Sequence, residues 1–279
     1  MKRLPMLAWV VAIIALVASA ALVGSNLPGR TATATTNPVR QASVKLHRTI
    51  PKEPGGFTQG LEVRRGVLYE SVGLYGSSEI RSVELKTGKV IKRKPLDQKF
   101  FAEGMTVVPG KSGAASDRII QLTWKEQTAI VRDVASLDEV DRLPYTQEGW
   151  GVCYNATRKV LIHSDGSSVF LLRDPRTFRE RGRLQVRMPD GSRPTELNEL
   201  ECQRDAIYVN IWQQSKILEI DPTTGIVRRT IDLSSLVPTT LASPDDVLNG
   251  IAALGNGRFL VTGKRWPNYF EVSFHDVTR

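Results

Sequence analysis

The chain has few of the residues on which metal and nucleophile chemistry usually depends. Its 279 residues include only two cysteines and three histidines, and their wide separation leaves no recognisable metal-ligand pattern. The G-x-S-x-G, H-E-x-x-H and Gly-rich phosphate-loop motifs are also missing. A histidine-based triad, a metal site and a cofactor are therefore not expected.

Long apolar runs are lacking too, with one exception near the N-terminus. Lys2 and Arg3 precede the uncharged run Leu7–Val23, which as a helix would span roughly 25 Å, slightly less than a hydrocarbon core. Ala18–Ala20 supplies an A-x-A cleavage site, which favours a signal peptide over residues 1–23. The alternative is an uncleaved anchor in the inner membrane. Both interpretations predict an exported protein, periplasmic or secreted if the segment is cleaved.

The segment that follows shows no periodicity. Residues 24–41 are rich in Thr, Ala, Asn and Pro, a composition typical of a disordered linker. The folded domain is therefore expected over residues 42–279.

The positive charge is not concentrated in one place. The net charge is +9, but Arg and Lys are scattered through predicted strands and turns, whereas a nucleic-acid-binding protein would gather them on one face. The densest runs, Lys92–Lys94 and Arg179–Arg183, fall in predicted outer strands or their turns. No nucleic-acid partner is expected.

A short pattern returns five times, at intervals of 44, 47, 48 and 51 residues. A polar or aromatic residue precedes a small residue, and a short apolar strand follows. Self-similarity near 45 residues predicts an all-β fold, a five-bladed β-propeller with four strands in each blade. Equivalent positions then form a ring around one axis. These ring positions are Gln59, Glu103, Trp150, Asn198 and Asn249.

The strand count predicts how the ring closes. The fifth repeat offers only three strands, over residues 250–274, while a spare strand over residues 44–50 precedes the first repeat. Placed as the outer strand of the last blade, this N-terminal strand completes the blade and covers an unpaired edge.

The two cysteines lie on the first strands of neighbouring repeats. Cys153 and Cys202 follow their ring positions closely, and the innermost strands of adjacent blades run side by side. In an oxidising compartment a disulfide can form between them. Two buried thiols are the alternative.

A second set of positions, at the ends of the second strands, is expected to reach the same face as the ring. It holds Trp124, Trp212 and Lys264, with Gly73 and His163 in the other two blades. Including two flanking phenylalanines, the predicted mouth carries Phe57, Gln59, Phe101, Glu103, Trp124, Trp150, Asn198, Trp212, Asn249 and Lys264.

Each of these side chains has a plain structural alternative. The indoles could pack between blades, Glu103 could bond backbone N–H groups, and Lys264 could be solvated. Together, however, aromatic walls with a few convergent polar groups are typical of a small-ligand site. Glu103 is the only acid in the ring, so acid–base chemistry would fall to it. Aromatic neighbours would raise its pKa and Lys264 would oppose that change.

Five strings at blade spacing resemble a known family. They are Phe57–Leu61 (FTQGL), Phe101–Thr106 (FAEGMT), Glu148–Gly151 (EGWG), Leu197–Glu201 (LNELE) and Leu248–Ala252 (LNGIA). In this order they resemble the plant and bacterial glutaminyl cyclases, which are five-bladed glutaminyl-peptide cyclotransferases. The resemblance extends over residues 47–274.

The resemblance implies an acyltransferase that converts the N-terminal glutamine of peptides or proteins to pyroglutamate, releasing ammonia without a catalytic metal. It implies that Glu103 acts first as general base and then as general acid. Gln59, Asn198 and Lys264 match the family's polar substrate-binding positions. The aromatic substrate-binding positions match Phe57, Phe101, Trp124, Trp150 and Trp212. Asn249 enters through the ring pattern alone, and a monomer is expected.

From the residues alone, other functions stay open. A ring of carboxamides, indoles and one carboxylate would equally suit a non-catalytic propeller that binds a peptide or a carbohydrate. A lactonase or quinoprotein-type enzyme is a weaker alternative, because such enzymes usually need a calcium site of several carboxylates, which this mouth lacks.

Overall fold

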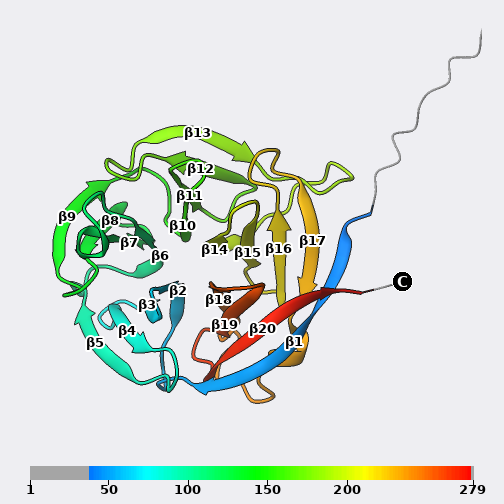
Figure 1. Ribbon diagram of the computed structural model, residues 1–279, viewed down its shortest axis with the longest axis horizontal. Helices are drawn as coiled ribbons and strands as arrows, with labels where there is room; N and C mark the ends of the chain where they lie inside the picture. The colour runs from blue at the N-terminus through cyan, green and yellow to red at the C-terminus, as the bar shows by residue number, and fades with distance from the viewer. Residues whose placement is uncertain (1–37, 278–279) are drawn as a thin grey trace, which may run out of the picture. The chain divides into compact units, whose positions relative to one another are not determined.

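A computed structural model describes residues 38–277, and these form an almost entirely β structure (Figure 1). Two short 3-10 helices, η1 (Ala114–Ser116) and η2 (Ser234–Leu236), lie in connections. The first ten strands are β1 (Arg40–Pro51), β2 (Thr58–Arg64), β3 (Val67–Val72), β4 (Glu79–Glu84), β5 (Val90–Pro95), β6 (Ala102–Val108), β7 (Arg118–Thr123), β8 (Thr128–Asp133), β9 (Glu139–Pro144) and β10 (Gly151–Asn155). The others are β11 (Val160–Ser164), β12 (Val169–Arg173), β13 (Glu180–Gln185), β14 (Leu197–Cys202), β15 (Ile207–Ile211), β16 (Lys216–Ile220), β17 (Val227–Asp232), β18 (Leu248–Gly255), β19 (Arg258–Gly263) and β20 (Asn268–Asp276).

The strands form consecutive sheets around a common centre, and they are antiparallel except where β1 meets β17. Three sheets have the orders β2-β3-β4-β5, β6-β7-β8-β9 and β10-β11-β12-β13, and an eight-stranded sheet has the order β14-β15-β16-β17-β1-β20-β19-β18. The strands β2, β6, β10, β14 and β18 lie innermost (Figure 1). The prediction of an all-β, propeller-like fold is therefore confirmed.

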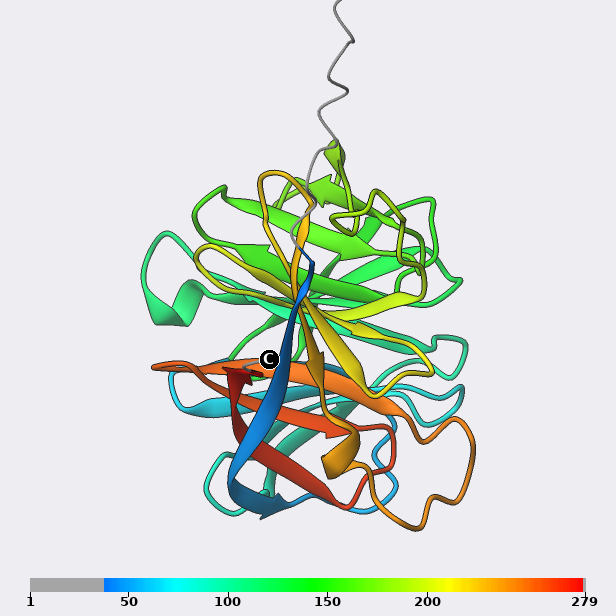
Figure 2. The same ribbon diagram turned by 90° about the vertical axis from the view of Figure 1, so that its right-hand side faces the viewer.

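The N-terminal strand is present and is longer than the predicted 44–50. β1 pairs in antiparallel fashion with β20 and in parallel with β17, and it lies on the outside of the molecule (Figures 1 and 2). Arg40 and Gln41, which were assigned to the linker 24–41, already belong to the strand. These two residues join the strand because their backbone groups pair with β17. Such pairing needs no apolar periodicity, so the sequence pattern did not indicate it. The Arg40 guanidinium also lies 2.9 Å from the Asp276 carboxylate.

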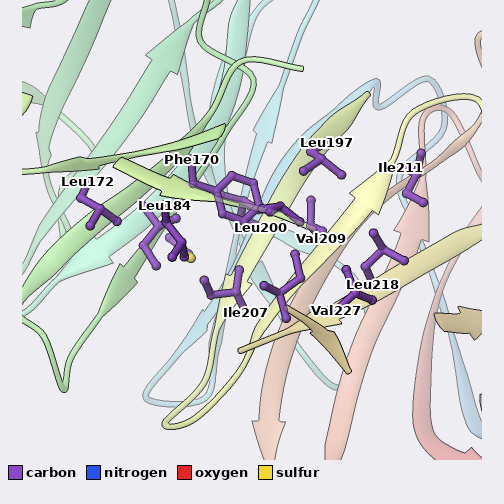
Figure 3. Packing of buried hydrophobic residues seen from close by; sticks show 14 of the residues in the cluster. Phe170, Leu172, Leu184, Leu197, Leu200, Ile207, Val209, Ile211, Leu218 and Val227 are labelled. Carbon is purple, nitrogen blue, oxygen red and sulfur yellow. The ribbon is translucent and has the colours of Figure 1, made fainter. Parts of the chain in front are cut away.

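The hydrophobic core lies between successive sheets. One cluster joins the sheet β10–β13 to strands β14–β17, with Phe170, Leu200 and Val209 at its centre (Figure 3). The middle strands are mostly buried, and β15 is buried along its whole length, whereas the outer strand β5 is mostly exposed. Residues 92–94 lie on that exposed strand, and residues 180–183 lie on the outer strand β13. Solvated outer strands thus account for both basic runs.

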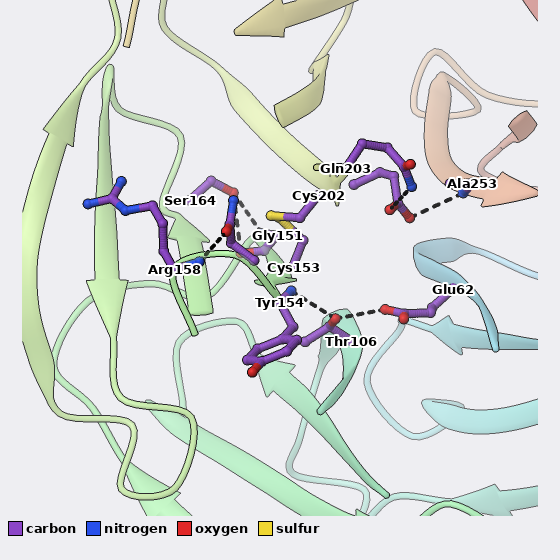
Figure 4. Close-up of a disulfide and its surroundings, with 12 residues drawn as sticks. Glu62, Thr106, Gly151, Cys153, Tyr154, Arg158, Ser164, Cys202, Gln203 and Ala253 are labelled. Carbon is purple, nitrogen blue, oxygen red and sulfur yellow. Dashed lines mark hydrogen bonds between the residues drawn. A yellow bond between two sulfur atoms is a disulfide. The ribbon is translucent and has the colours of Figure 1, made fainter. Parts of the chain in front are cut away.

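Cys153 on β10 and Cys202 on β14 are joined by a disulfide, with their Cα atoms 5.4 Å apart (Figure 4). The bond connects the inner strands of two neighbouring sheets and closes a loop with a sequence separation of 49 residues. A cross-link of this length mainly restricts the unfolded chain. Both cysteines pack against the apolar cluster between these sheets.

Replacing both cysteines with alanine is expected to lower the free energy of unfolding by about 2–4 kcal/mol. Urea denaturation of the variant and of the oxidised parent would measure the difference. Adding a reductant should destabilise the parent and leave the variant unchanged. Equal stability of the two oxidised proteins would contradict the expectation.

Three carboxyls, those of the buried Glu199 and Glu201 and the half-buried Glu62, link the inner strands. Each accepts a backbone N–H from another inner strand: Glu62 from Val107 (3.1 Å), Glu199 from Leu61 (3.2 Å) and Ile251 (2.8 Å), and Glu201 from Ala253 (3.2 Å). Burial raises the pKa of Glu62 to about 7 and that of Glu201 to about 8, and it raises the pKa of Glu199 well above the usual value. These carboxyls bind protons more tightly in the folded protein than in the unfolded chain. Their contribution to the free energy of unfolding is therefore largest at low pH, and it is lost as the pH rises through their folded-state pKa values.

A buried ionic network joins the first sheet to the last. The Glu70 carboxylate on β3 lies 2.7 Å from the Arg81 guanidinium and 3.6 Å from the Lys52 ammonium, and all three side chains are almost inaccessible to solvent. Glu70 also accepts the hydroxyls of Thr58 and Tyr269. Burial alone would raise the pKa of Glu70, but Lys52 and Arg81 hold that pKa below its usual value. Because Tyr269 lies on β20, the network spans the junction of the two sheets.

Within residues 38–277 no helix is long and apolar enough to cross a membrane. The predicted signal peptide or anchor, residues 1–23, lies outside the described residues.

Candidate functional site

A cavity of about 300 Å³ lies where the inner strands begin and the second strands end. The ligand-binding mouth was predicted from the sequence at this same end of the strands. Nine of the ten residues predicted there line it: Phe57, Gln59, Phe101, Glu103, Trp124, Trp150, Asn198, Trp212 and Lys264. The tenth, Asn249, lies behind Gln59 and bonds to it. The lining also includes Leu74, Asp245 and Arg265.

Irregularities in the β-ladders direct the ring residues inward. The register between first and second strands shifts at residues 58–60, 102–105, 197–200 and 248–251. These segments contain Gln59, Glu103, Asn198 and Asn249. Because a bulge bends a strand and re-aims its side chains, it can turn a polar residue toward the axis.

The glycine after a ring residue permits the close approach of inner strands. A Cβ on Gly60 would lie 2.5 Å from the Met105 nitrogen, and one on Gly104 would lie 2.7 Å from the Gly151 Cα. The fourth repeat has Glu199 where the others have glycine. Its side chain bonds instead to the backbone of two other inner strands.

A chain of amide hydrogen bonds orients Glu103. The side-chain amide of Asn249 donates to the Gln59 carbonyl at 3.0 Å, and the Gln59 amide donates to the Glu103 carboxyl at 3.1 Å. Asn249 also donates to the Thr58 carbonyl oxygen at 3.0 Å. All three side chains are at least 95% buried. Gln59 therefore presents its amino group, and not its oxygen, to Glu103.

Burial dominates the electrostatics of the site. It raises the pKa of Glu103 well above its usual value, against the opposing charge of Lys264, while Glu148 and Glu126 raise it further. Burial also lowers the pKa of Lys264, which Glu103 opposes. Burial thus moves the pKa of the Glu103 carboxyl up and that of the Lys264 amine down, toward each other.

Asn198 lines the cavity, and its buried side-chain oxygen is unsatisfied within residues 38–277. Its side chain is 3% exposed, and the side-chain oxygen has no hydrogen-bond partner among the described residues. Burying such an oxygen without a donor is costly.

The aromatic side chains form two runs around the cavity. Phe57, Phe101 and Trp124 make consecutive edge-on contacts, with ring centroids 6.2 and 5.6 Å apart. Trp150 and Trp212 make a second edge-on pair at 5.9 Å. The Lys264 ammonium lies 5.0 Å from the centre of the Phe57 ring. Such walls hold an organic ligand and exclude water.

Four residues of this region were missed by the sequence reasoning. Arg265 follows Lys264 directly and packs over Phe57, 4.7 Å from the ring centre. Leu74 and Asp245 lie in connections that carry no repeat signal. Glu148 is visible in the EGWG string, where it stands two residues before Trp150.

His163, placed by the sequence in the second set of positions, does not line the cavity. It is fully buried, bonds to the carbonyl oxygen of Glu148 at 3.0 Å and accepts the Arg173 guanidinium at 2.8 Å. Burial lowers the pKa of His163 to about 3. A neutral imidazole here supports the segment that leads to Trp150.

No three His, Cys, Asp or Glu side chains within residues 38–277 are grouped so that they could hold a metal ion.

Comparisons with known proteins agree with one another. Residues 16–274 match the sequence model of the glutamine cyclotransferase family. The chain is 36% identical over 241 residues to an Arabidopsis thaliana glutaminyl-peptide cyclotransferase, covering 84% of this chain and 72% of that protein. The fold is similar to a crystal structure of Myxococcus xanthus glutaminyl cyclase, with a TM-score of 0.77 and 34% identity over 87% of this chain and 100% of that chain. The chain belongs to the glutamine cyclotransferase family.

Proposed function

We propose that this protein is a glutaminyl-peptide cyclotransferase that closes the N-terminal glutamine of peptides or proteins to pyroglutamate and releases ammonia. The observation that carries the proposal is the buried Glu103 carboxyl, hydrogen-bonded to Gln59 in an aromatic cavity that is also lined by Lys264 and Asn198. Family membership supports the same reaction.

The proposed reaction needs a folded-back substrate and two proton transfers. The substrate α-nitrogen attacks its own side-chain amide carbon, which forms the C–N bond of a five-membered lactam. Glu103 takes a proton from that nitrogen and then gives it to the departing NH₂ group, which leaves as ammonia. Because the attack is intramolecular, walls that hold the reactive conformer contribute much of the rate.

The neighbouring polar groups receive distinct roles in this proposal. Asn198, which lines the cavity, forms a hydrogen bond with the substrate. Lys264 stabilises the oxyanion of the tetrahedral intermediate. Gln59 holds Glu103 in place, and Asn249 acts through Gln59. Gln59 and Asn249 therefore position the catalytic carboxyl more than they contact substrate.

We propose that the fold is a five-bladed propeller, with β1 as the outer strand of the last blade. The support is the pairing of β1 with β20 and the innermost position of five strands, each of which begins a group of three or four. The additional pairing of β1 with β17 merges two such groups into one sheet.

We also propose that the protein is exported and acts as a monomer. The Cys153–Cys202 disulfide supports export, because such bonds persist in oxidising compartments. Mass spectrometry of the native protein would show whether residues 1–23 are removed as a signal peptide or retained as an anchor.

A non-catalytic binding propeller is the alternative, and ammonia release separates the two. Incubated with Gln-Phe-Ala, the protein is expected to release ammonia well above the uncatalysed rate, and to do so equally with EDTA present. The same peptide should quench tryptophan fluorescence, whereas its N-acetylated form should not, since recognition requires the free amine. Quenching by both forms without ammonia release would favour the binding protein.

The rate should depend on pH through Glu103. A base accepts a proton only when ionised, so kcat/KM is expected to fall as pH falls through the folded-state pKa of Glu103. Burial raises this pKa, and the acid limb should therefore lie above about 4.3, the value for an ordinary glutamate. Replacing Lys264 with methionine should move the limb to still higher pH, because Lys264 lowers the pKa of Glu103. An acid limb near the ordinary value would contradict this assignment.

A further inference from the structure

The two aromatic runs of the cavity meet at one carboxylate. Oxygen Oε2 of Glu148 accepts the indole N–H of Trp124 at 2.8 Å and the indole N–H of Trp150 at 3.1 Å. Trp124 ends the run that begins at Phe57, and Trp150 begins the run that ends at Trp212. The Oε2 atom of Glu148 therefore links two neighbouring sheets, because Trp124 follows β7 and Trp150 precedes β10.

The backbone around Glu148 is held firmly. Its carbonyl oxygen bonds to the buried His163 ring, and the next residue, Gly149, donates its N–H to the Trp124 carbonyl at 2.9 Å. Gly149 has no room for a side chain, since a Cβ there would lie 2.5 Å from the Thr123 carbonyl oxygen. The position of the carboxylate is thus set by contacts that lie outside the cavity lining.

We propose that Glu148 is a positioning residue of the cyclotransferase site, whose carboxylate holds the indoles of Trp124 and Trp150 at the angle that fits the folded-back glutamine. The inference rests on the proposed function. An indole has one N–H group, and Trp124 and Trp150 both donate it to the same Glu148 oxygen. Rotation of either ring would therefore break a charge-assisted hydrogen bond. The substrate then meets only the faces and edges of these two indoles, while the titratable groups of Glu103 and Lys264 lie elsewhere in the cavity lining.

The charge of Glu148 has a second, separable effect. With Glu126 it raises the pKa of the nearby Glu103, while Lys264 lowers it. Replacement by glutamine keeps an oxygen that can accept both indole N–H groups and removes the charge. Replacement by alanine removes both, so the pair of variants separates anchoring from electrostatics.

The test compares Glu148→Gln and Glu148→Ala, with Gln-Phe-Ala as substrate. Glu148→Gln should retain KM and move the acid limb of kcat/KM to lower pH. Glu148→Ala should move the limb in the same direction and also lower kcat/KM by about 10²-fold, the size expected for a misplaced substrate wall. An Ala variant with wild-type KM and kcat would overturn the proposal, as would a Gln variant as defective as Ala.

A double-mutant cycle shows whether Glu148 acts through the indoles. In a Trp124→Phe/Trp150→Phe background, which lacks both N–H donors, Glu148→Ala should cause no further loss of kcat/KM. Additive losses would refute the anchoring role.

Tryptophan emission supplies a readout that is independent of turnover. Glu148→Ala should shift the emission maximum and Glu148→Gln should restore it, with thermal melts showing that both variants fold. Identical spectra for wild type and Ala would refute the anchor. A wild-type protein that releases no ammonia would refute the proposed function instead, and the emission spectra would still decide the role of Glu148.

Discussion

Replacing Glu103 with glutamine is expected to lower kcat for cyclisation by about 10²- to 10⁴-fold, the contribution typical of a positioned general acid–base. The carboxamide keeps the shape of the side chain but cannot carry the proton from the substrate amine to the leaving NH₂. Ammonia release from Gln-Phe-Ala under saturating substrate measures the effect. Binding of the peptide, followed by fluorescence quenching, should change much less.

The fold should tolerate this substitution. The pKa of Glu103 is raised by burial, which means that the folded state favours the uncharged form, and glutamine is uncharged. Thermal unfolding should therefore occur at or above the wild-type temperature. Glu139→Gln, on the exposed outer strand β9, is the matched control and should retain full activity. Near wild-type turnover by the Glu103 variant would remove this residue from the mechanism.

Replacing Glu70 with alanine is expected to lower the free energy of unfolding by about 3–5 kcal/mol, as found when one partner of a buried ion pair is removed. The variant would leave the Arg81 guanidinium and the Lys52 ammonium buried without their carboxylate. It would also remove the acceptor of Tyr269, which lies on β20. Guanidinium denaturation measures the loss.

An exposed ion pair provides the comparison. Glu139 and Arg142 pair on the surface of β9, and Glu139→Ala should cost at most about 1 kcal/mol. Hydrogen exchange would locate the Glu70 effect, because amides of β1, β2 and β20 should lose protection before those of β10–β13. Equal stability losses for the two alanine variants would argue that the buried network does not hold the first and last sheets together.

The repeat in the sequence predicted the cavity wall well, because each ring residue has an independent local signal. Gln59 and Glu103 each precede a glycine at the start of an apolar strand. Once the strands are arranged around an axis, equal positions in different repeats must meet, whatever their separation in the chain. Trp124 and Trp212 could be predicted in the same way, because each follows the second strand of its repeat.

Residues that break the symmetry could not be found in this way. Asp245 and Arg265 reach the cavity from connections between strands, where the residue type is not repeated from one sheet to the next. Residues 40 and 41 were assigned to a linker, because their pairing with β17 depends on backbone groups and not on side-chain pattern. His163 occupied the right position in its repeat, yet its ring turns away from the cavity to the Glu148 carbonyl.

The order of the strands within each repeat and the identity of nine cavity residues could thus be predicted from the period of the chain, because spacing and alternation are properties of local sequence. The direction in which each polar group points could not. Whether Gln59 offers its oxygen or its amino group to Glu103 depends on Asn249, which lies 190 residues away. The packing of the five inner strands decides whether burial or the charge of Lys264 has the larger effect on the pKa of Glu103. It also decides which oxygen accepts the N–H groups of the two indoles. Desolvation and hydrogen-bond geometry arise only when these distant segments share one small volume.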